Sequence, residues 1–393
     1  MQEKSTRLEF KPRDFVHLHL HSDYSLLQST IQLKPLTKSL KDFDMKACAI
    51  TDYGNMFGAI SFYNEMKYND LHPIIGYEAF ITFGSRFDKN IPLETGERPY
   101  YQLVLLAKDF RGYLNLAYLA SKAFTDGFHH KPRIDLELLS EKSGGLIALS
   151  SGFEGAIWHY LQKENHSKAK STAGKFQDIF GKENFFLEIQ DHGLQSEKNL
   201  QRELLALSKE SEIPLVATND THYLSTDDAR SHEILMCIGD GKTIFDSTRR
   251  VFDAQTYHLT SAEEMWSKFG KEVPDSLLNT LKIAEMCQVE IPLEDNLELP
   301  DFPIPVQSKS ETTDEYFEEV VRLGFEQRKT AVWEPLKSAG KLKYSYDDYE
   351  DRLKIEIGTI KNMGFPGYFL VVWDFIKYAI EQGAKIVLAS HLG

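Results

Sequence analysis

Short apolar runs alternate with helical patterns along the amino-terminal part of the chain. The runs are four to eight residues long, as buried strands are, and they cover residues 15–20, 47–50, 74–81, 103–107, 146–149, 185–189 and 214–217. Between them apolar residues recur three or four positions apart, for example at Leu33, Leu36, Leu40 and Phe43. This alternation predicts a parallel sheet with helical crossovers. About seven such units favour a βα barrel over an open sheet.

Polar residues whose side chains could bind a metal or take part in catalysis stand at or just after the ends of these runs. In a βα barrel the carboxyl ends of the strands form the functional face, so side chains that are distant in sequence converge there. Gln102 does not fit this pattern, because it begins its run. The residues that do fit are His19, His21, Asp52, Tyr53, Asp191, His192, Asp220 and His222, with Glu78 inside the third run.

The βα rhythm stops near Ile238, and the rest of the chain has a different pattern. An acidic, proline-containing stretch at 292–305 predicts a linker or a connection along the surface. Apolar residues at 349, 353, 357 and 360 then predict an amphipathic helix, on which Glu350 and Lys354 can pair. Residues 364–367 break this helix, and a more apolar helix follows from about Tyr368 to Ile380.

Composition and charge narrow the class of protein. The 393 residues are 42% hydrophobic and 26% charged, which is ordinary for a soluble globular protein and excludes a disordered chain. The formal net charge of −14 argues against a protein that coats nucleic acid by charge alone, although a local basic groove is compatible with it.

The sequence predicts a cytoplasmic protein without a membrane segment. Residues 1–14 are charged throughout and contain no apolar core, unlike a signal peptide. The most apolar segment, 368–373, meets Asp374 long before it could cross a bilayer. No CxxC pair occurs, which indicates buried thiols in a reducing compartment, at Cys48, Cys237 and Cys287.

Three histidines alternate along the first apolar run. Side chains two residues apart on an extended strand share a face, so His19 and His21 can point at one metal ion. His17 shares that face, and spacing alone does not choose between the pairs. The simpler alternative is a surface strand that happens to hold three histidines. We favour the metal site, because strict alternation of three histidines is unusual and imidazole is the commonest metal ligand.

Other candidate ligands carry weaker signals. Asp220 and His222 repeat the two-residue spacing, but taken alone Asn219-Asp220-Thr221 favours a turn or a helix N-cap. Glu78 is harder to dismiss, since a carboxylate in a buried strand is costly without a cation. Asp191-His192-Gly193 could be only a turn. The sequence contains no phosphate-binding glycine loop, GxSxG serine or supported thiol nucleophile, and we therefore assign no catalytic residue.

Several of these motifs resemble one family along nearly the whole chain. The chain is similar to the bacterial replicative DNA polymerase III alpha subunits, and the segment at 363–370 belongs to the polymerase palm of that family. The matching segments are FVHLHLHSDYSLL at 15–27, AITDYGN at 49–55, PIIGYEA at 73–79, KPRID at 131–135, ATNDTHY at 217–223 and MGFPGYFL at 363–370.

The resemblance implies a polymerase-and-histidinol-phosphatase (PHP) domain, which is a distorted, seven-stranded βα barrel. By position, one divalent ion would be held by His19, His21, Glu78 and Asp220. The other two ion sites of the family are broken, and His192 matches a histidine position near the site. The second site needs a histidine and a cysteine where this chain has Gln102 and Gly152; the third needs an aspartate and a histidine where it has Gln28 and Tyr53, beside His222.

We therefore expect at most one divalent ion (zinc, manganese or magnesium) and little or no hydrolysis. The resemblance assigns residues 1–290 to the PHP domain and residues 291–393 to a linker and the truncated, mostly helical beginning of the palm. Residues 384–393 depart from the family pattern. The palm carboxylates that hold two catalytic Mg²⁺ ions would come later, so the chain alone is not expected to polymerise DNA and looks like a fragment or a frameshifted product.

Three functions follow as alternatives. The first is the amino-terminal part of a replicative polymerase, which supports the enzyme, docks a separate proofreading exonuclease and other replisome subunits, and meets DNA only through the full-length protein. The second is a free-standing PHP metallophosphoesterase, motivated by the four surviving ligands. The third is a scaffold without an ion, in which Tyr53 and Gln102 complete a hydrogen-bonded network.

Overall fold

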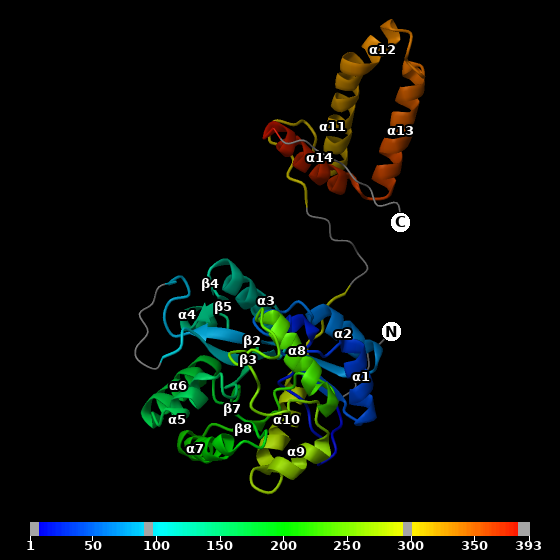
Figure 1. The fold of residues 1–393 in the computed structure, drawn as a ribbon. Helices are drawn as coiled ribbons and strands as arrows, with labels where there is room; N and C mark the ends of the chain where they lie inside the picture. The colour runs from blue at the N-terminus through cyan, green and yellow to red at the C-terminus, as the bar shows by residue number, and fades with distance from the viewer. Residues whose placement is uncertain (1–7, 90–96, 294–300, 384–393) are drawn as a thin grey trace. The chain divides into compact units, whose positions relative to one another are not determined.

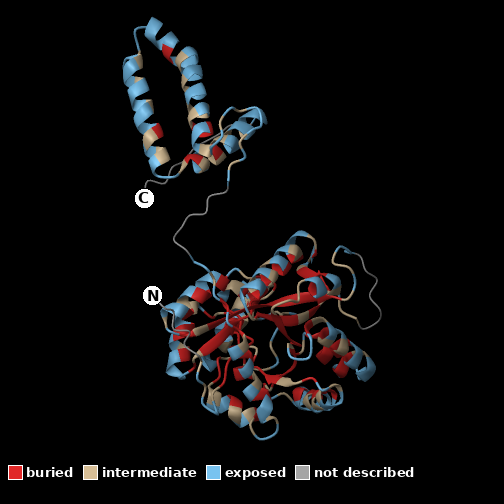
Figure 2. Cartoon of the chain, turned by 180° about the vertical axis from the view of Figure 1, so that it is seen from behind, coloured by how far each residue is buried: buried red, intermediate tan, exposed pale blue. Residues whose placement is uncertain are grey.

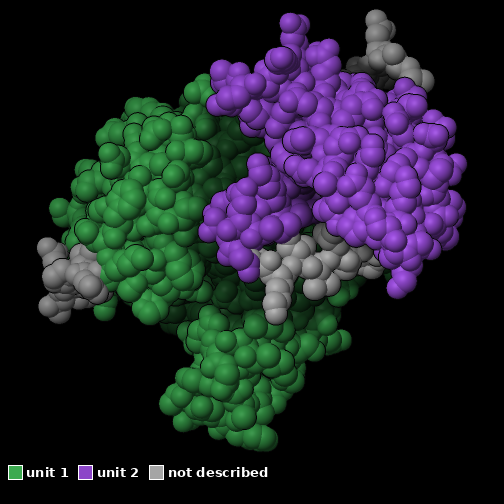
Figure 3. Space-filling view, turned by 90° about the horizontal axis from the view of Figure 1, so that it is seen from above, with its two compact units in different colours: residues 1–291 green, residues 292–393 purple. Residues whose placement is uncertain are grey.

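The computed structural model describes residues 8–89, 97–293 and 301–383. Within them the chain divides into two compact units, residues 1–291 and 292–393, which are coloured separately in Figure 3. The stretch at 294–300 and the segment 384–393, for which a linker and a departure from the palm pattern are predicted, lie outside the described residues.

A curled sheet forms the centre of the first unit. Its described strands follow the order β4-β5-β2-β3-β6-β7-β8, and β1 pairs with β2. Parallel bridges join His17 to Cys48 of β1 and Leu20 to Thr221, just after β8, so residues 17–20 connect the two ends of the sheet. The strands are β1 (Ala47–Ile50), β2 (His72–Thr82), β3 (Tyr101–Ala107), β4 (Phe128–His129), β5 (Lys131–Asp135), β6 (Leu146–Leu149), β7 (Phe185–Ile189) and β8 (Leu215–Ala217).

Most of the predicted strands are confirmed. The runs at 47–50, 146–149 and 185–189 coincide with β1, β6 and β7. The run at 15–20 contributes only the isolated bridges described above, and the short β4–β5 hairpin was not predicted.

The prediction of an all-parallel sheet is wrong at β3, which runs antiparallel to β2 and to β6. No helix lies between β2 and β3 in the described residues, and two strands without a crossover pair antiparallel. As a result Gln102, at the start of β3, lies opposite Phe80 near the carboxyl end of β2. Its position at the start of a run therefore agrees with a functional face at that edge.

Both faces of the sheet are buried, as Figure 2 shows by the red strands at the centre of this unit. Ile74, Phe186 and Val216 belong to one apolar cluster, to which α10 adds Leu281 and Ile283. Because side chains alternate along a strand, Glu78, Glu188 and Thr218 share the face of these three apolar residues. The buried polar groups thus form a layer on top of an apolar one.

The opposite face of the sheet packs against helices that surround it (Figure 1). The helix α1 illustrates why they form, since Leu36 and Leu40 lie one turn apart on its buried side. The helices of this unit are α1 (Leu33–Asp42), α2 (Ala59–Tyr68), α3 (Phe110–Thr125), α4 (Leu136–Glu141), α5 (Ala156–Gln162), α6 (His166–Phe180), α7 (Gln195–Ser211), α8 (Ala229–Gly239), α9 (Ala262–Phe269) and α10 (Pro274–Met286), with the short turns η1 (Asp23–Ser25) and η2 (Thr226–Asp228).

The second unit is helical. Its small core contains Tyr316, Phe317, Ile357 and Leu370. The predicted amphipathic helix and its apolar successor are confirmed as α13 and α14, and the Glu350 carboxylate lies 4.0 Å from the Lys354 ammonium group. The elements are α11 (Thr313–Arg328), the π-helical turn η3 (Lys329–Trp333), α12 (Glu334–Ser338), α13 (Tyr346–Asn362) and α14 (Pro366–Glu381). Among the described residues no helix is long and apolar enough to cross a bilayer.

The close pairing of β2 and β3 yields a stability prediction. A Cβ at Gly76 would lie 2.4 Å from the Leu105 carbonyl oxygen. We expect Gly76→Ala to lower the free energy of unfolding by about 1–3 kcal/mol, because backbone atoms must shift. Gly174, in α6, has nothing within 4 Å of its Cβ position, so Gly174→Ala should raise stability by up to about 1 kcal/mol. Urea unfolding measures both, and equal effects would contradict the argument.

Candidate metal centre

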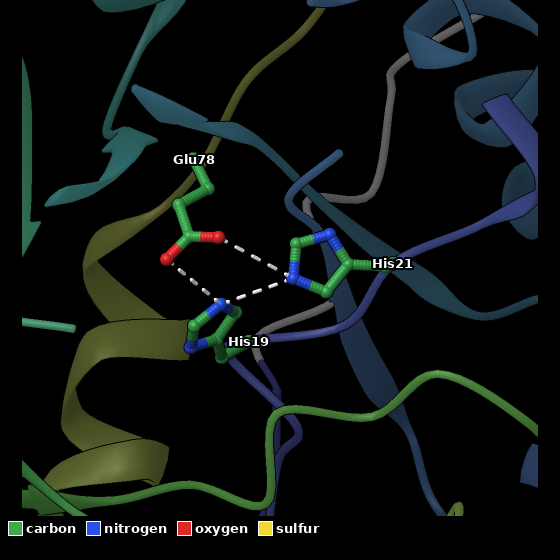
Figure 4. A group of neighbouring side chains, drawn as sticks. All are labelled: His19, His21 and Glu78. Carbon is green, nitrogen blue, oxygen red and sulfur yellow. Dashed lines mark hydrogen bonds and ion pairs between the residues drawn. The ribbon is translucent and has the colours of Figure 1, made fainter. Parts of the chain in front are cut away.

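Four side chains from separate segments meet at one edge of the sheet. His19 and His21 come from the segment that bridges β1 and Thr221, Glu78 comes from β2, and Asp220 follows β8. Figure 4 shows the two imidazoles and the Glu78 carboxylate facing one another. The three are buried, with exposed fractions of 2% or less.

The distances between donor atoms are those of ligands around one ion. The two Nε2 atoms of His19 and His21 lie 3.2 Å apart, and they lie 3.4 and 3.5 Å from the Glu78 oxygens. Asp220 Oδ1 lies 3.4 Å from His19 Nε2 and 3.2 Å from His21 Nε2. Ligands at about 2.0–2.2 Å from a tetrahedral metal are separated by about 3.3–3.6 Å. His19, His21 and Glu78 therefore fit a divalent cation, and Asp220 lies close enough to both imidazoles to join them.

Unsatisfied oxygens support the same fit. Glu78 Oε2, Asp220 Oδ1 and Glu188 Oε2 are buried and accept no hydrogen bond. A buried carboxylate oxygen without a donor is costly unless a cation meets it. The donor set of two imidazoles and two carboxylates is also one that zinc and manganese accept.

Strained backbone conformations help to position Asp220 and, through Ser151, Glu78. Asp220 has a φ of 42° and Ser151 a φ of 57°, a left-handed region that non-glycine residues adopt at a cost. Both residues follow strands, β8 and β6 respectively, at the edge where the site lies. Ser151 donates a short hydrogen bond from Oγ to Glu78 Oε1, which orients that carboxylate.

Hydrogen bonds to the far side of each imidazole set its tautomer. His19 Nδ1 donates to Glu188 Oε1 at 2.7 Å. Ser25 Oγ donates to Asp52 Oδ1 at 2.6 Å, and so it can accept from His21 Nδ1 at 3.2 Å. With Nδ1 donating in both rings, each Nε2 presents its lone pair to the common point. Such outer partners are typical of metal-binding histidines.

The local charges favour a cation. Burial alone would lower the pKa of His19, but Glu188, Glu78 and Asp220 outweigh it and raise that pKa well above 6.5. Burial and the neighbouring His222 lower the pKa of His21 to about 3. Burial raises the pKa of Glu78. Burial would also raise the pKa of Asp220, but His19 and His222 hold it well below 3.8.

Two other predicted histidines lie outside the donor group. His17, which spacing could not exclude, turns away: its Nε2 is 2.9 Å from the Thr260 carbonyl oxygen. His192 has both ring nitrogens engaged, Nδ1 with Glu197 Oε1 at 2.6 Å and Nε2 with the Asn219 carbonyl oxygen at 3.1 Å. The ring nitrogens of both residues are thus occupied by structural partners.

Beside the four donors, His222 and Tyr53 form a second group. His222 Nδ1 donates to the Gln28 carbonyl oxygen at 2.7 Å, and its Nε2 lies 3.2 Å from Asp220 Oδ1. The Tyr53 hydroxyl lies 3.5 Å from the same Nε2. Tyr53 and His222 each stack on the His21 ring, with centroid distances of 4.0 and 4.5 Å. Tyr53 thus caps His222, and the Gln28 side chain turns to Arg250, at 3.3 Å.

Gly152 and Gln102 lie at the same edge without adding a ligand. A Cβ at Gly152 would lie 2.0 Å from Gln190 Oε1, so the Gln190 amide fills the space that a side chain there would need. Gln190 Nε2 donates to Glu188 Oε1 at 2.8 Å and to Thr218 Oγ1 at 3.3 Å. Gln102 is half-buried and pairs with Gly155 through the backbone.

The sequence placed Asp52 at this edge without a role, and it did not single out Glu188 or Ser25. Glu188 is fully buried and also accepts a short hydrogen bond from Thr218 Oγ1. Its signal was present, since it is the single charged residue in the apolar run 185–189. The same argument that singled out Glu78 applies to it.

Comparison with known proteins finds two families in the chain. The family described as PHP domain matches residues 17–192, and the family described as bacterial DNA polymerase III alpha NTPase domain matches residues 315–389. The donors His19, His21 and Glu78 fall inside the first match, and Asp220 falls after it.

Individual relatives can be aligned with 95% of the chain. They are named DNA polymerase III subunit alpha, and are 38% identical in Helicobacter pylori, 40% in Treponema pallidum and 35% in Thermus aquaticus. The chain spans only 31%, 30% and 34% of their lengths. A solved structure titled putative metal-dependent phosphoesterase, from Bifidobacterium adolescentis, covers 65% of the chain and 95% of its own at 10% identity, and its TM-score of 0.33 is too low to support an argument.

The buried His17 yields a prediction about pH. Burial lowers the pKa of His17 from 6.5 to about 4. Between pH 6.5 and pH 4, the unfolded chain therefore binds a proton at His17 that the folded chain does not bind. Stability should therefore fall as the pH is lowered from 6.5 to 4. We expect His17→Gln to remove up to about 3 kcal/mol of this fall, measured by urea unfolding with a chelator present. An unchanged pH slope would contradict a neutral, buried His17.

Proposed function

From the premise that this chain carries a PHP domain and is homologous to the bacterial DNA polymerase III alpha subunits, we propose that it forms the amino-terminal module of a replicative DNA polymerase. Residues 1–290 form the PHP domain, and residues 291–393 form a linker and the first part of the palm. The PHP domain holds one divalent ion and serves mainly as a structural and docking module. DNA synthesis is the activity of full-length polymerases of this family, whose palm uses Mg²⁺, and we do not expect it of these residues alone.

The observation that carries the one-ion proposal is the convergence of His19, His21, Glu78 and Asp220, in two overlapping groups that share His21. Their spacing supports one ion, of zinc, manganese or magnesium, at these four side chains. Hydrolysis of phosphoesters usually positions substrate and hydroxide between two or three ions. Gln190 fills the space above Gly152, and Tyr53 caps His222, so the neighbouring positions are taken by side chains.

When bound, a divalent ion supplies a fixed positive charge and a Lewis acid. The protein's own side chains hold the ligands of this site in position. Glu188 and Ser25 hold the two imidazoles with Nε2 toward the donor group, and Ser151 holds Glu78. The rings of Tyr53 and His222 both stack on the His21 imidazole, with centroids 4.0 and 4.5 Å away, and they contact each other. These contacts support a rigid, structural ion site.

Metal content and hydrolysis test this part of the proposal. We expect one equivalent of metal per chain by plasma mass spectrometry, and none in His21→Ala, because one of the four ligands is lost. His17→Gln is the matched control and should keep its ion, since its ring points elsewhere. Hydrolysis of bis-p-nitrophenyl phosphate with Mn²⁺ or Zn²⁺ should stay at background. Two or more equivalents of metal per chain, or robust metal-dependent hydrolysis, would contradict the proposal.

The alternative, a free-standing PHP metallophosphoesterase, is favoured by the intact four-donor group alone. The match of residues 315–389 to the polymerase family, and the 95% of the chain shared with polymerase relatives, speak for the first proposal. The hydrolysis assay separates the two. The ion-free scaffold is the third case, and an empty site in the ion assay would support it.

Docking of the proofreading exonuclease subunit is the other part of the proposal. A site with one ion is poorly suited to proofreading, which favours a separate nuclease as partner. We expect the immobilised full chain to retain the exonuclease subunit of the same organism at micromolar concentration. His21→Ala should retain it equally, because docking does not depend on the ion. Failure of the unaltered chain to bind at this concentration would contradict docking but not the ion site.

A further inference from the structure

A pocket separate from the four donors lies on the first unit, within the part of the chain that the structure describes. Its volume is about 610 Å³. Its walls come from the end of β2 and the start of β3, from the β4–β5 hairpin and from α5 and α6. Pockets of roughly 300–1,000 Å³ are the usual size for small-molecule ligands.

A buried guanidinium lines this pocket. Arg133 is 2% exposed, and its Nε donates to the Gly127 carbonyl oxygen at 3.1 Å. Its Nη2 donates to the carbonyl oxygens of Arg86, at 3.3 Å, and Asp88, at 2.8 Å. Within the described ranges no carboxylate forms an ion pair with it. Burial lowers the pKa of Arg133, and the Asp88 carboxylate offsets only part of this cost, so the arrangement favours an anion in the pocket.

Further cations line the same walls. Lys89 and Lys175 stand there with no carboxylate partner among the described residues, beside the imidazoles of His129 and His130. Among the described lining residues Glu97 is the one carboxylate. It pairs with the Lys168 ammonium group and accepts hydrogen bonds from the Tyr101 and Tyr160 hydroxyls, at 2.8 and 2.9 Å.

The pocket therefore has excess positive charge in a protein whose formal net charge is −14. A local charge of the opposite sign to that of the whole chain indicates a specific anion rather than general attraction. Arginine and lysine together are the groups that bind phosphate in proteins.

Aromatic rings form another part of the lining. Phe83, Tyr100, Tyr101 and Tyr160 contribute rings, and Phe83 packs on Tyr101 with a centroid distance of 5.5 Å. Tyr101 and Tyr160 are buried, but Phe83 and Tyr100 are only partly buried. Aromatic rings beside phosphate-binding cations suit a ligand that carries both a flat base and phosphates. We propose that this pocket binds a nucleoside polyphosphate, with its phosphates toward Arg133, Lys89 and Lys175. This proposal does not depend on the ion site.

The test is calorimetric titration of the full chain with dADP, in EDTA so that the four-donor group plays no part. We expect dADP to bind, inorganic pyrophosphate to bind more weakly, and deoxyadenosine not to bind. Lys89→Glu combined with Lys175→Glu should weaken dADP binding by about tenfold or more, because two charge-assisted contacts become repulsive. Both lysines are exposed, so the variant should fold.

The matched control carries the same charge change elsewhere. Lys34→Glu combined with Lys38→Glu, on exposed positions of α1, should bind dADP as the unaltered chain does. His21→Ala should also bind equally, which separates this pocket from the ion site. No dADP binding in the millimolar range, equal loss in the two double variants, or equal binding of a triglutamate peptide would overturn the proposal.

Discussion

The first unit is organised around the cost of burying carboxylates away from solvent. Glu78 and Glu188 project from β2 and β7 onto the sheet face that also holds Ile74 and Phe186. Ionised groups at such a place need a positive partner nearby. His19 lies between the two carboxylates, 2.7 Å from Glu188 and 3.4 Å from Glu78. This is why the pKa of His19 is raised although its ring is buried.

The departures at the neighbouring positions follow from the same constraint. A second ion would have to displace the Gln190 amide, whose Nε2 already donates to Glu188. A third would have to displace the Tyr53 hydroxyl from His222 and the Arg250 guanidinium from Gln28. In each case neutral or fixed groups satisfy acceptors that would otherwise require a metal. These contacts support the proposal of one ion rather than several at this edge.

Sequence alone predicted the strands well, because four to eight consecutive apolar residues leave few alternatives, and β1, β6 and β7 begin and end where the runs do. It could not predict the antiparallel β3, since strand direction depends on what connects the strands. Alternation of the histidines and the cost of a buried Glu78 indicated a metal site, but the set of four donors, Asp220 included, came from the family resemblance. The sequence could not distinguish His17 from His19, because that depends on the Thr260 carbonyl contact, 243 residues away.

The first unit has two places where charge is not balanced, the four-donor group and the pocket that Arg133 lines. The unbalanced charges have opposite signs, which indicates two different roles. At the four-donor group the unsatisfied atoms are carboxylate oxygens, so the missing partner is a cation. In the pocket the unbalanced group is the Arg133 guanidinium, held by carbonyl oxygens alone among the described residues, so the missing partner is an anion. One ligand cannot satisfy both. A nucleotide in the pocket and an ion at the four donors would each relieve a separate electrostatic cost, and loss of one should leave the other in place.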